Sequence, residues 1–283
     1  MNYNEKLELY FELKNTPEAS RKSYFKRIEV FIKFAQEHSE NSIEELTLED
    51  AQSYILHLKK NKGLTTGTIN AYMSVIKFFY IHILDREWDS NKVPRMRMVQ
   101  KFAVIPPRGD IMALLDKATN LKHKSFLVLM YGSGLRVGEV AKLKISDICS
   151  KTMRVRVDNA KHNTNRYSIL SNVALKVLRD YFKVHFSSAY AKSDWLFPGK
   201  DKGKHISTKT IKNTIIRLRN QLHLDVNISA STLRHCFATY MLEDGVDPVF
   251  IQQLLGHRHL KTTVAYLHMT SKSLMGIKSP LDT

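Results

Sequence analysis

A proline-containing basic segment at residues 86–107 divides the chain into two parts with different sequence patterns. It contains Pro94, Pro106 and Pro107, and proline cannot continue a helix because it lacks the backbone N–H and clashes with the preceding turn. The segment also contains three cations that are too polar to be buried: Arg95, Arg97 and Lys101. We expect an extended linker between two domains, with cations that are either solvated or lie along a phosphate backbone.

Residues 1–85 have the apolar periodicity of amphipathic helices. One set of apolar residues recurs at helical spacing after Pro17: Tyr24, Ile28, Phe31 and Ile32. A later set does the same: Ile69, Tyr72, Ile76, Phe79 and Tyr80. Thr47 is followed by acidic residues, which is typical of the first turn of a helix. These patterns predict an N-terminal helical domain over residues 1–85.

Residues 108–283 predict a second domain that is mostly helical but contains a small sheet. Met153, Val155 and Val157 alternate with polar residues, and the short run "NRYSIL" follows after the turn-like "NAKHNT". We expect a β-hairpin or the edge of a three-stranded antiparallel sheet here. The predicted fold class is therefore mostly α with a small antiparallel β-sheet in the C-terminal domain.

The charge balance indicates a polyanionic partner. The chain has 283 residues, with 44 Lys and Arg against 27 Asp and Glu, which gives a formal net charge of +17. A solvated basic surface, a membrane surface and nucleic acid are each compatible with this excess, and nucleic acid is the partner that it favours. Because the cations are spread over the whole chain, we expect a broad cationic face on folded structure.

Composition also predicts the compartment. Cys149 and Cys236 lie far apart, so a disulfide framework is not expected and a reducing cytoplasm fits. The N-terminal "MNYNEKLELYF" is too charged for a signal peptide. No run of about 18 apolar residues occurs, so no membrane span is expected.

Two arginines lie in apolar surroundings, where a guanidinium group is costly unless it is paired or used. They are Arg136 in "YGSGLRVGEVAKL" and Arg234 in "STLRHCFATYM". Arg136 could be structural and paired with Glu139 one turn later. Alternatively, the two arginines could clamp one phosphate and stabilise the added charge of its pentacoordinate transition state. Lys161, in the predicted hairpin turn, could reach that phosphate as a proton donor, and His257 could donate a hydrogen bond to it.

The stretch "LLGHRHLKTTVAYLH" offers two further interpretations, a metal site and a nucleophile. Its histidines, His257, His259 and His268, lack metal-ligand spacing, so no metal site is expected. Tyr266 could be a packed aromatic residue on a helix. It could also be a nucleophile, because a cluster of cations would lower the pKa of a phenol from its usual value of about 10.

Two long motifs resemble those of the tyrosine recombinases, also called the phage integrase family. "GLRVGEVAKLKISDI" is similar to the family's first arginine box, and "LRHCFATYMLEDGVDPVFIQQLLGHRHLKTTVAYLH" is similar to the second at full length. The resemblance covers nearly the whole chain. It implies a helical core-binding domain and a catalytic domain that form a clamp around duplex DNA. The end, "KSLMGIKSPLDT", resembles the tails of integron-type and mobile-element integrases, although the insertion that integron integrases carry between the boxes is absent.

The resemblance implies a site-specific recombinase that cuts and rejoins duplex DNA by transesterification through a 3′-phosphotyrosyl link, without metal or nucleotide cofactor. Arg136 and Arg234 would bind the scissile phosphate, and Glu139 would orient them. Lys161 would protonate the leaving 5′ oxygen, and His257 would contact the phosphate. Tyr266 would be the nucleophile. The expected partners are double-stranded DNA with specific sites and further copies of the chain, as a tetramer in the synaptic complex and a monomer when free.

Two departures from the family pattern affect the expected rate and the lysine assignment. Ser231 stands three residues before Arg234, where the family usually has histidine, and serine cannot act as a cation or base near neutral pH. His235 matches a separate position where histidine is common. The hairpin reads "NAKHNTNR" in place of a glycine-lysine-glycine turn. From sequence alone, the chemistry is expected to run at a reduced rate that Ser231→His would increase.

Two alternatives share part of this pattern: a catalytically weakened DNA-binding relative, which Ser231 favours, and a type IB topoisomerase-like nicking and closing enzyme.

The expected DNA-binding residues are cations of the linker and of the helix predicted from "STKTIKNTIIRLRNQL". They are Arg95, Arg97, Lys101, Lys209 and Lys212.

The net charge predicts a steep dependence of DNA affinity on salt. A protein that neutralises 6–10 phosphates releases their counterions and loses at least about 10³-fold in affinity between 50 and 200 mM salt. Titration of a labelled duplex at several KCl concentrations measures the slope. An affinity that does not change with salt would contradict the predicted phosphate-binding surface.

Overall fold

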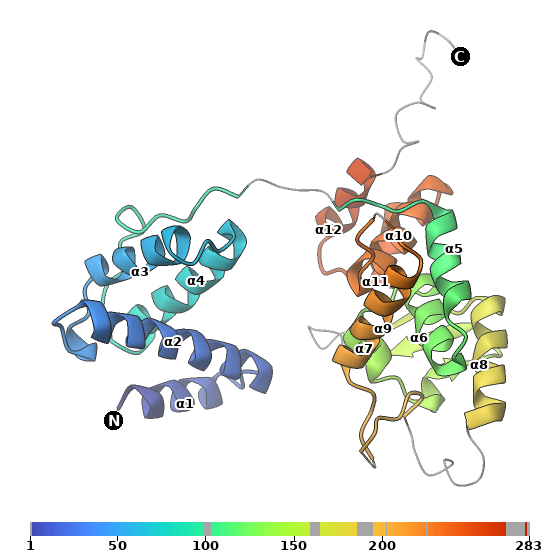
Figure 1. The fold of residues 1–283 in the computed structure, drawn as a ribbon, viewed down its shortest axis with the longest axis horizontal. Helices are drawn as coiled ribbons and strands as arrows, with labels where there is room; N and C mark the ends of the chain where they lie inside the picture. The colour runs from blue at the N-terminus through green and yellow to red at the C-terminus, as the bar shows by residue number, and fades with distance from the viewer. Residues whose placement is uncertain are drawn as a thin grey trace. The chain divides into compact units, whose positions relative to one another are not determined.

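The computed structural model describes residues 2–98, 103–158, 165–185, 195–201, 203–224, 226–269 and 281. The chain forms two compact units, Met1–Gln100 and Lys101–Thr283 (Figure 1). Each unit has its own hydrophobic core. Two units were expected from the sequence.

The first unit is helical, as predicted. Its helices are α1 (Tyr3–Leu13), α2 (Glu18–His38), the 3-10 helix η1 (Ile43–Glu45), α3 (Leu48–Lys60) and α4 (Thr66–His82). Thr47 accepts from the backbone N–H of Asp50, and Asp50 accepts from that of Thr47, so α3 begins with a capping box. The core includes large aromatic side chains, of which Phe31, Phe79 and Tyr80 are almost fully buried.

Residues 86–98, which we expected to belong to the linker, pack on the first unit. Val93 is 3% exposed, and the Trp88 ring lies edge-on to Tyr80 with centroids 5.4 Å apart. The buried Asn70 of α4 donates to the Met96 carbonyl at 2.9 Å and accepts from the Met96 N–H at 3.0 Å. The described parts of the proline-containing segment, residues 86–98 and 103–107, therefore form no helix, and the first of them is held by the hydrogen bonds of Asn70.

The second unit is mostly helical around a small sheet. Its helices are α5 (Arg108–Lys117), α6 (Leu121–Gly132), α7 (Val137–Ala141), η2 (Ile145–Asp147), α8 (Asn172–His185), α9 (Thr208–Gln221), α10 (Ala230–Glu243), α11 (Pro248–Leu255), α12 (Leu260–Val264) and η3 (Ala265–Met269). Its strands are β1 (Ile148–Cys149), β2 (Arg154–Val157) and β3 (Arg166–Ile169). They form an antiparallel sheet in the order β1-β2-β3, with Val157 opposite Arg166. The predicted fold class is confirmed.

Helix α6 lies in the middle of this unit, with α8 on one side and α10 on the other (Figure 1). Its middle, from Ser125 to Met130, is buried around the whole circumference, whereas its first turn carries Lys122, His123 and Lys124 and is partly exposed. A helix segment that is buried on all sides contacts neighbours in several directions. The residues that follow α6 are therefore held firmly where the candidate site lies.

No helix in the described part of the chain has the length and apolarity needed to cross a membrane.

Replacing Asn70 with Ala should loosen the backbone around Met96 on the first unit. The Met96 amide and carbonyl would lose their partners, at a cost of about 1–3 kcal/mol, so exchange of the Met96 amide should speed up by roughly tenfold or more. Hydrogen exchange read by NMR or mass spectrometry measures this. Lys59→Ala, on an exposed site of α3, is the control and should leave exchange unchanged.

Candidate active site

Residues from six elements of the second unit meet at one place. The contributing segments are the turn after α6, the start of α7, β3, α10, the end of α11 and η3. They lie up to 132 residues apart in the chain, from Gly134 to Tyr266. The cluster therefore exists only in the folded domain.

Glu139 is the centre of this cluster. Its carboxylate accepts from Arg136 Nη1 at 2.9 Å and from the Arg136 backbone N–H at 2.8 Å. It also accepts from both terminal nitrogens of Arg166, at 2.9 and 2.8 Å, and lies 3.9 Å from Arg234 Nη1. Burial raises the pKa of Glu139, but hydrogen bonds and charge from Arg166, then from Arg136, outweigh it and leave the pKa lowered. The carboxylate is therefore ionised and binds three guanidinium groups.

Arg234 is buried, with a side chain only 7% exposed. It donates to the Gly134 carbonyl at 2.7 Å, to the Leu255 carbonyl at 2.6 Å and to His257 Nε2 at 3.1 Å. Burial and the charge of Arg136 lower its pKa to about 10, so it is still protonated at neutral pH. The guanidinium group is thus held in one orientation before any substrate is bound.

Two glycines with left-handed backbone allow these contacts. Gly134 has φ of +61°, and a Cβ there would lie 2.4 Å from a ring carbon of Phe237. Gly256 ends α11 with φ of +64°, and a Cβ there would lie 2.7 Å from Arg166 Cδ. The last turn of α11 points its free carbonyls at the cluster, where those of Leu254 and Leu255 accept from two arginines.

Arg166 is the site residue that our sequence reasoning missed. Its side chain is 7% exposed, and besides Glu139 it binds the Leu254 carbonyl through Nε at 2.8 Å. A signal was present in the strand itself. Arg166 and Ser168 are buried, whereas Tyr167 and Ile169 are exposed. In an ordinary surface strand the apolar side chains face the core and the polar ones face solvent, and β3 has the reverse arrangement. An arginine on the inward face of a strand requires a buried acceptor.

His257 lies between Arg234 and Thr263. Its Nε2 accepts from Arg234, and its Nδ1 lies 2.8 Å from Thr263 Oγ1, which corresponds to a neutral ring that carries its proton on Nδ1. Burial and then the charge of Arg234 lower the pKa of His257 to about 4. The histidine is neutral at pH 7 in the DNA-free protein.

Tyr266 combines both interpretations that the sequence left open. Its ring is 6% exposed and packs with Phe237, Ile251 and Leu255, while its hydroxyl lies 3.1 Å from His235 Nδ1. The nearby cations lower its pKa, as expected, but the net shift in the DNA-free protein is upward. Burial raises the pKa and outweighs the lowering by Arg234 and Arg136. The phenol is therefore protonated, and attack by its oxygen requires a group that removes the proton.

The remaining predicted residues fall into three groups. Lys161 and Lys101 lie outside the described residues. Ser231 is exposed on α10, one turn before His235. Arg95 and Arg97 are exposed on the first unit, and Lys209 and Lys212 are exposed on α9.

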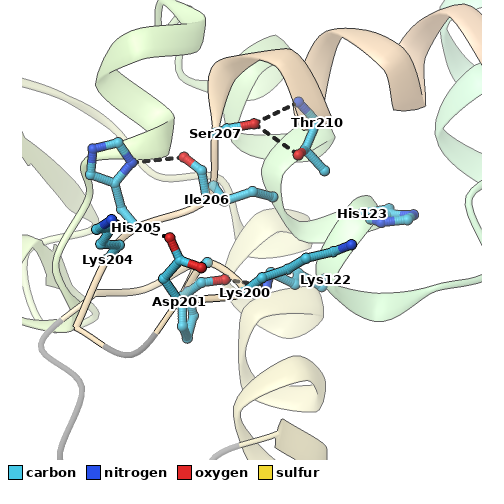
Figure 2. Close-up of a pocket in the computed structure, with 11 residues that line it drawn as sticks. Lys122, His123, Lys200, Asp201, Lys204, His205, Ile206, Ser207 and Thr210 are labelled. Carbon is cyan, nitrogen blue, oxygen red and sulfur yellow. Dashed lines mark hydrogen bonds and ion pairs between the residues drawn. The ribbon is translucent and has the colours of Figure 1, made fainter.

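A separate basic pocket adjoins the start of α9 (Figure 2). The lysines that line it are Lys122, Lys200 and Lys204, and none of the predicted catalytic residues takes part. Lys122 is half-buried and donates to the Pro198 carbonyl, and burial lowers its pKa. The pocket therefore adds to the positive surface near Lys209 without belonging to the arginine cluster.

Comparison with known proteins identifies the family. The model of the phage integrase family matches residues 109–273, and that of the phage integrase N-terminal SAM-like domain matches residues 4–90. The chain belongs to the phage integrase family. This tyrosine recombinase is 31% identical over 231 residues to tyrosine recombinase XerA of Pyrococcus horikoshii, which covers 81% of this chain and 78% of the relative. It is 34% identical over 242 residues to tyrosine recombinase XerC of Lacticaseibacillus casei, which covers 80% and 79%.

The fold also has solved relatives. A lambda integrase dimer bound to a COC′ core site superposes with a TM-score of 0.74 at 14% identity, covering 98% of this chain and 99% of that one. This likeness concerns the fold. Family membership and the similarity to the two tyrosine recombinases make the chain a tyrosine recombinase, an enzyme that cleaves and rejoins DNA at specific sites. The alternatives of a weakened DNA-binding relative and a topoisomerase-like enzyme are not favoured.

Replacing Arg166 with Met should weaken the tyrosine recombinase in two ways. Removing one partner of a buried ion pair costs about 3–5 kcal/mol of stability. The freed Glu139 would also no longer hold Arg136 in place, and small misplacement of a catalytic group costs about 100-fold in rate. Urea unfolding and the rate of covalent protein–DNA complex formation measure the two effects.

Arg156→Met is the matched control for this substitution. Arg156 lies on the neighbouring strand β2 and pairs with Asp147 at 3.0 Å, but its side chain is 44% exposed. It should lose less stability than Arg166→Met, because Arg156 is largely exposed although Asp147 is 6% exposed, and it should keep the cleavage rate. Equal rate losses in the two variants would contradict a specific role for Arg166.

Proposed function

We propose that Tyr266 of this recombinase attacks the scissile phosphate of duplex DNA and forms a 3′-phosphotyrosyl link. The observation that supports this most directly is the convergence of Arg136, Arg234, His257 and Tyr266 on Glu139 and its neighbours. The bond from Tyr266 Oη to phosphorus forms while the bond from phosphorus to the 5′ oxygen breaks. One phosphodiester replaces another, so rejoining needs only attack by a 5′ hydroxyl.

The arginines would stabilise the charge that develops on the phosphate. Three guanidinium groups and one carboxylate lie in the cluster: Arg136, Arg166, Arg234 and Glu139. Their net charge of +2 sits in a mostly buried site, where fixed charges act more strongly than in water. Arg136 is the more exposed of the two predicted phosphate-binding arginines, and its side chain is 36% exposed. We assign Arg136 to first contact with the phosphate and Arg234 to a preset position beside it.

Lys161 and His257 complete the proposed chemistry. Lys161, on the segment between β2 and β3, would give a proton to the leaving 5′ oxygen. His257 already contacts Arg234 through Nε2. A phosphate beside it would raise its pKa, because an opposite charge favours the protonated ring, and Nε2–H could then donate to a phosphate oxygen.

The proposed partners follow from the charge and the family. The substrate would be double-stranded DNA with specific recombination sites, contacted by Arg95, Arg97, Lys101, Lys209 and Lys212. Four copies of the chain would assemble on two sites, starting from free monomers, and the enzyme would act in the cytoplasm. The net charge of +17 supports a DNA partner because each phosphate contact releases counterions.

Tyr266→Phe should abolish covalent capture of DNA. The ring and its packing are kept, but the nucleophilic oxygen is lost, so no protein–DNA band should form on a nicked suicide substrate that carries the enzyme's own site. Tyr167→Phe, on an exposed ring of β3, is the matched control and should form the band at the rate of the unaltered enzyme.

A covalent band from Tyr266→Phe would overturn the assignment of the nucleophile. A plasmid with two sites distinguishes the recombinase from a topoisomerase-like enzyme. Exchange between the sites is expected, and relaxation of supercoils without exchange would contradict the proposal.

A further inference from the structure

We propose that His235 is the general base that removes the proton from Tyr266 during strand cleavage and returns it during rejoining. This inference rests on the proposed role of Tyr266 as nucleophile. The step balances without another reactant. The hydroxyl proton passes to His235 Nδ1, the Oη electron pair forms the bond to phosphorus, and the 5′ oxygen leaves with the electron pair of the broken bond and takes its own proton from Lys161.

The geometry places the imidazole on the reacting atom. His235 Nδ1 lies 3.1 Å from Tyr266 Oη, and the two ring centroids are 5.5 Å apart. A general base must lie within hydrogen-bond reach of the proton that it removes, and 2.6–3.2 Å is the usual range. Both residues are held by secondary structure, His235 in α10 and Tyr266 in η3.

Other groups near the hydroxyl do not offer a free proton acceptor. Arg234 also hydrogen-bonds to Tyr266, but a guanidinium group only donates. The His257 ring is stacked on Tyr266 with centroids 6.1 Å apart, and its two nitrogens contact Arg234 and Thr263. Of the contacts that the structure describes for the Tyr266 hydroxyl, His235 is therefore the one that can take the proton.

The electrostatic surroundings favour a neutral imidazole. Burial, and then the charge of Arg234, lower the pKa of His235, so the ring is unprotonated at neutral pH. The base requires the tautomer with its proton on Nε2, which leaves the Nδ1 lone pair toward Tyr266. Because burial keeps the phenol protonated, the two groups have the protonation states that a base and its nucleophile need before the reaction.

His235 also lies where its imidazole can compensate for Ser231, which stands in the second arginine box at a position where the family usually has histidine. Ser231 is four residues earlier on α10, on the same side of the helix, but it is exposed, whereas His235 is partly buried against Tyr266. The sequence alone predicted a rate reduced by Ser231. With His235 on the nucleophile, Ser231→His in the otherwise unaltered enzyme should change the cleavage rate by less than about threefold.

The main test compares His235→Ala with His235→Asn on a nicked suicide substrate. Asn can keep a hydrogen bond to Tyr266 but cannot take its proton. General base catalysis contributes about 10²–10⁴-fold, so both variants should form the covalent complex at least about 100-fold more slowly. An Asn variant within about threefold of the unaltered rate would overturn the proposal, because it would show that the hydrogen bond alone suffices. Equal DNA affinity and thermal melting of the variants establish that each is folded.

A substrate with sulfur in place of the bridging 5′ oxygen separates the base from the acid. A thiolate leaves without a proton, so this substrate should restore the rate of Lys161→Ala. It should leave His235→Ala slow, since the phenol still has to lose its proton. Restoration of His235→Ala by the thio substrate would overturn the assignment of His235 as the base.

The outcomes for Tyr266 keep the two proposals apart. If Tyr266→Phe forms no covalent complex while His235→Ala reacts at the unaltered rate, the base is wrong and the nucleophile stands. If Tyr266→Phe still forms the complex, the proposed nucleophile itself fails, and the inference about His235 fails with it.

Discussion

The arginine cluster of the second unit depends on one buried carboxylate. Glu139 accepts hydrogen bonds from Arg136 and Arg166 and lies within ion-pair distance of Arg234. Without it, three like charges in a poorly solvated site would repel one another and shift apart. With Glu139 in place, the arginine cluster keeps a net positive charge and its side chains stay fixed. Fixed charges can stabilise an anionic transition state without having to reorient during the reaction. The price is stability, because a buried ion pair recovers little of its desolvation energy.

Backbone geometry supplies the rest of the cluster's support. Carbonyls at the end of α11 and after α6 have no partner within a helix, and arginine side chains donate to them. Arg166 donates to Leu254, and Arg234 donates to Leu255 and Gly134. Gly134 and Gly256 make this possible, since each adopts a left-handed conformation at a point where a Cβ would collide with a neighbour. Tyr266, the proposed nucleophile, belongs to the same hydrophobic cluster as Ile251 and Leu255 of α11. The positions of the arginines and of the tyrosine are therefore coupled through α11.

Sequence patterns predicted helices, strands and turns well, because these elements depend mainly on interactions between neighbouring residues. Periodicity, caps and turn residues indicated helices in both units, a small antiparallel sheet that includes β2 and β3, and the end of α11 at Gly256. They were less accurate for residues 86–98, because proline excludes a helix but says nothing about packing on Asn70. They missed Arg166, whose partner Glu139 lies 27 residues away, and nothing in the intervening sequence joins the two.

The sequence by itself determined the fold class and the family, and it predicted five residues for the proposed phosphate chemistry, because helix periodicity and the two arginine boxes are properties of adjacent residues. Only the tertiary structure decided which groups contact one another and which protonation state each adopts. Burial raises the pKa of Tyr266, although the nearby cations suggested the reverse, and it leaves His235 neutral against the hydroxyl. Desolvation and distance depend on how six separated segments pack, and neither is encoded in the spacing of residues along the chain.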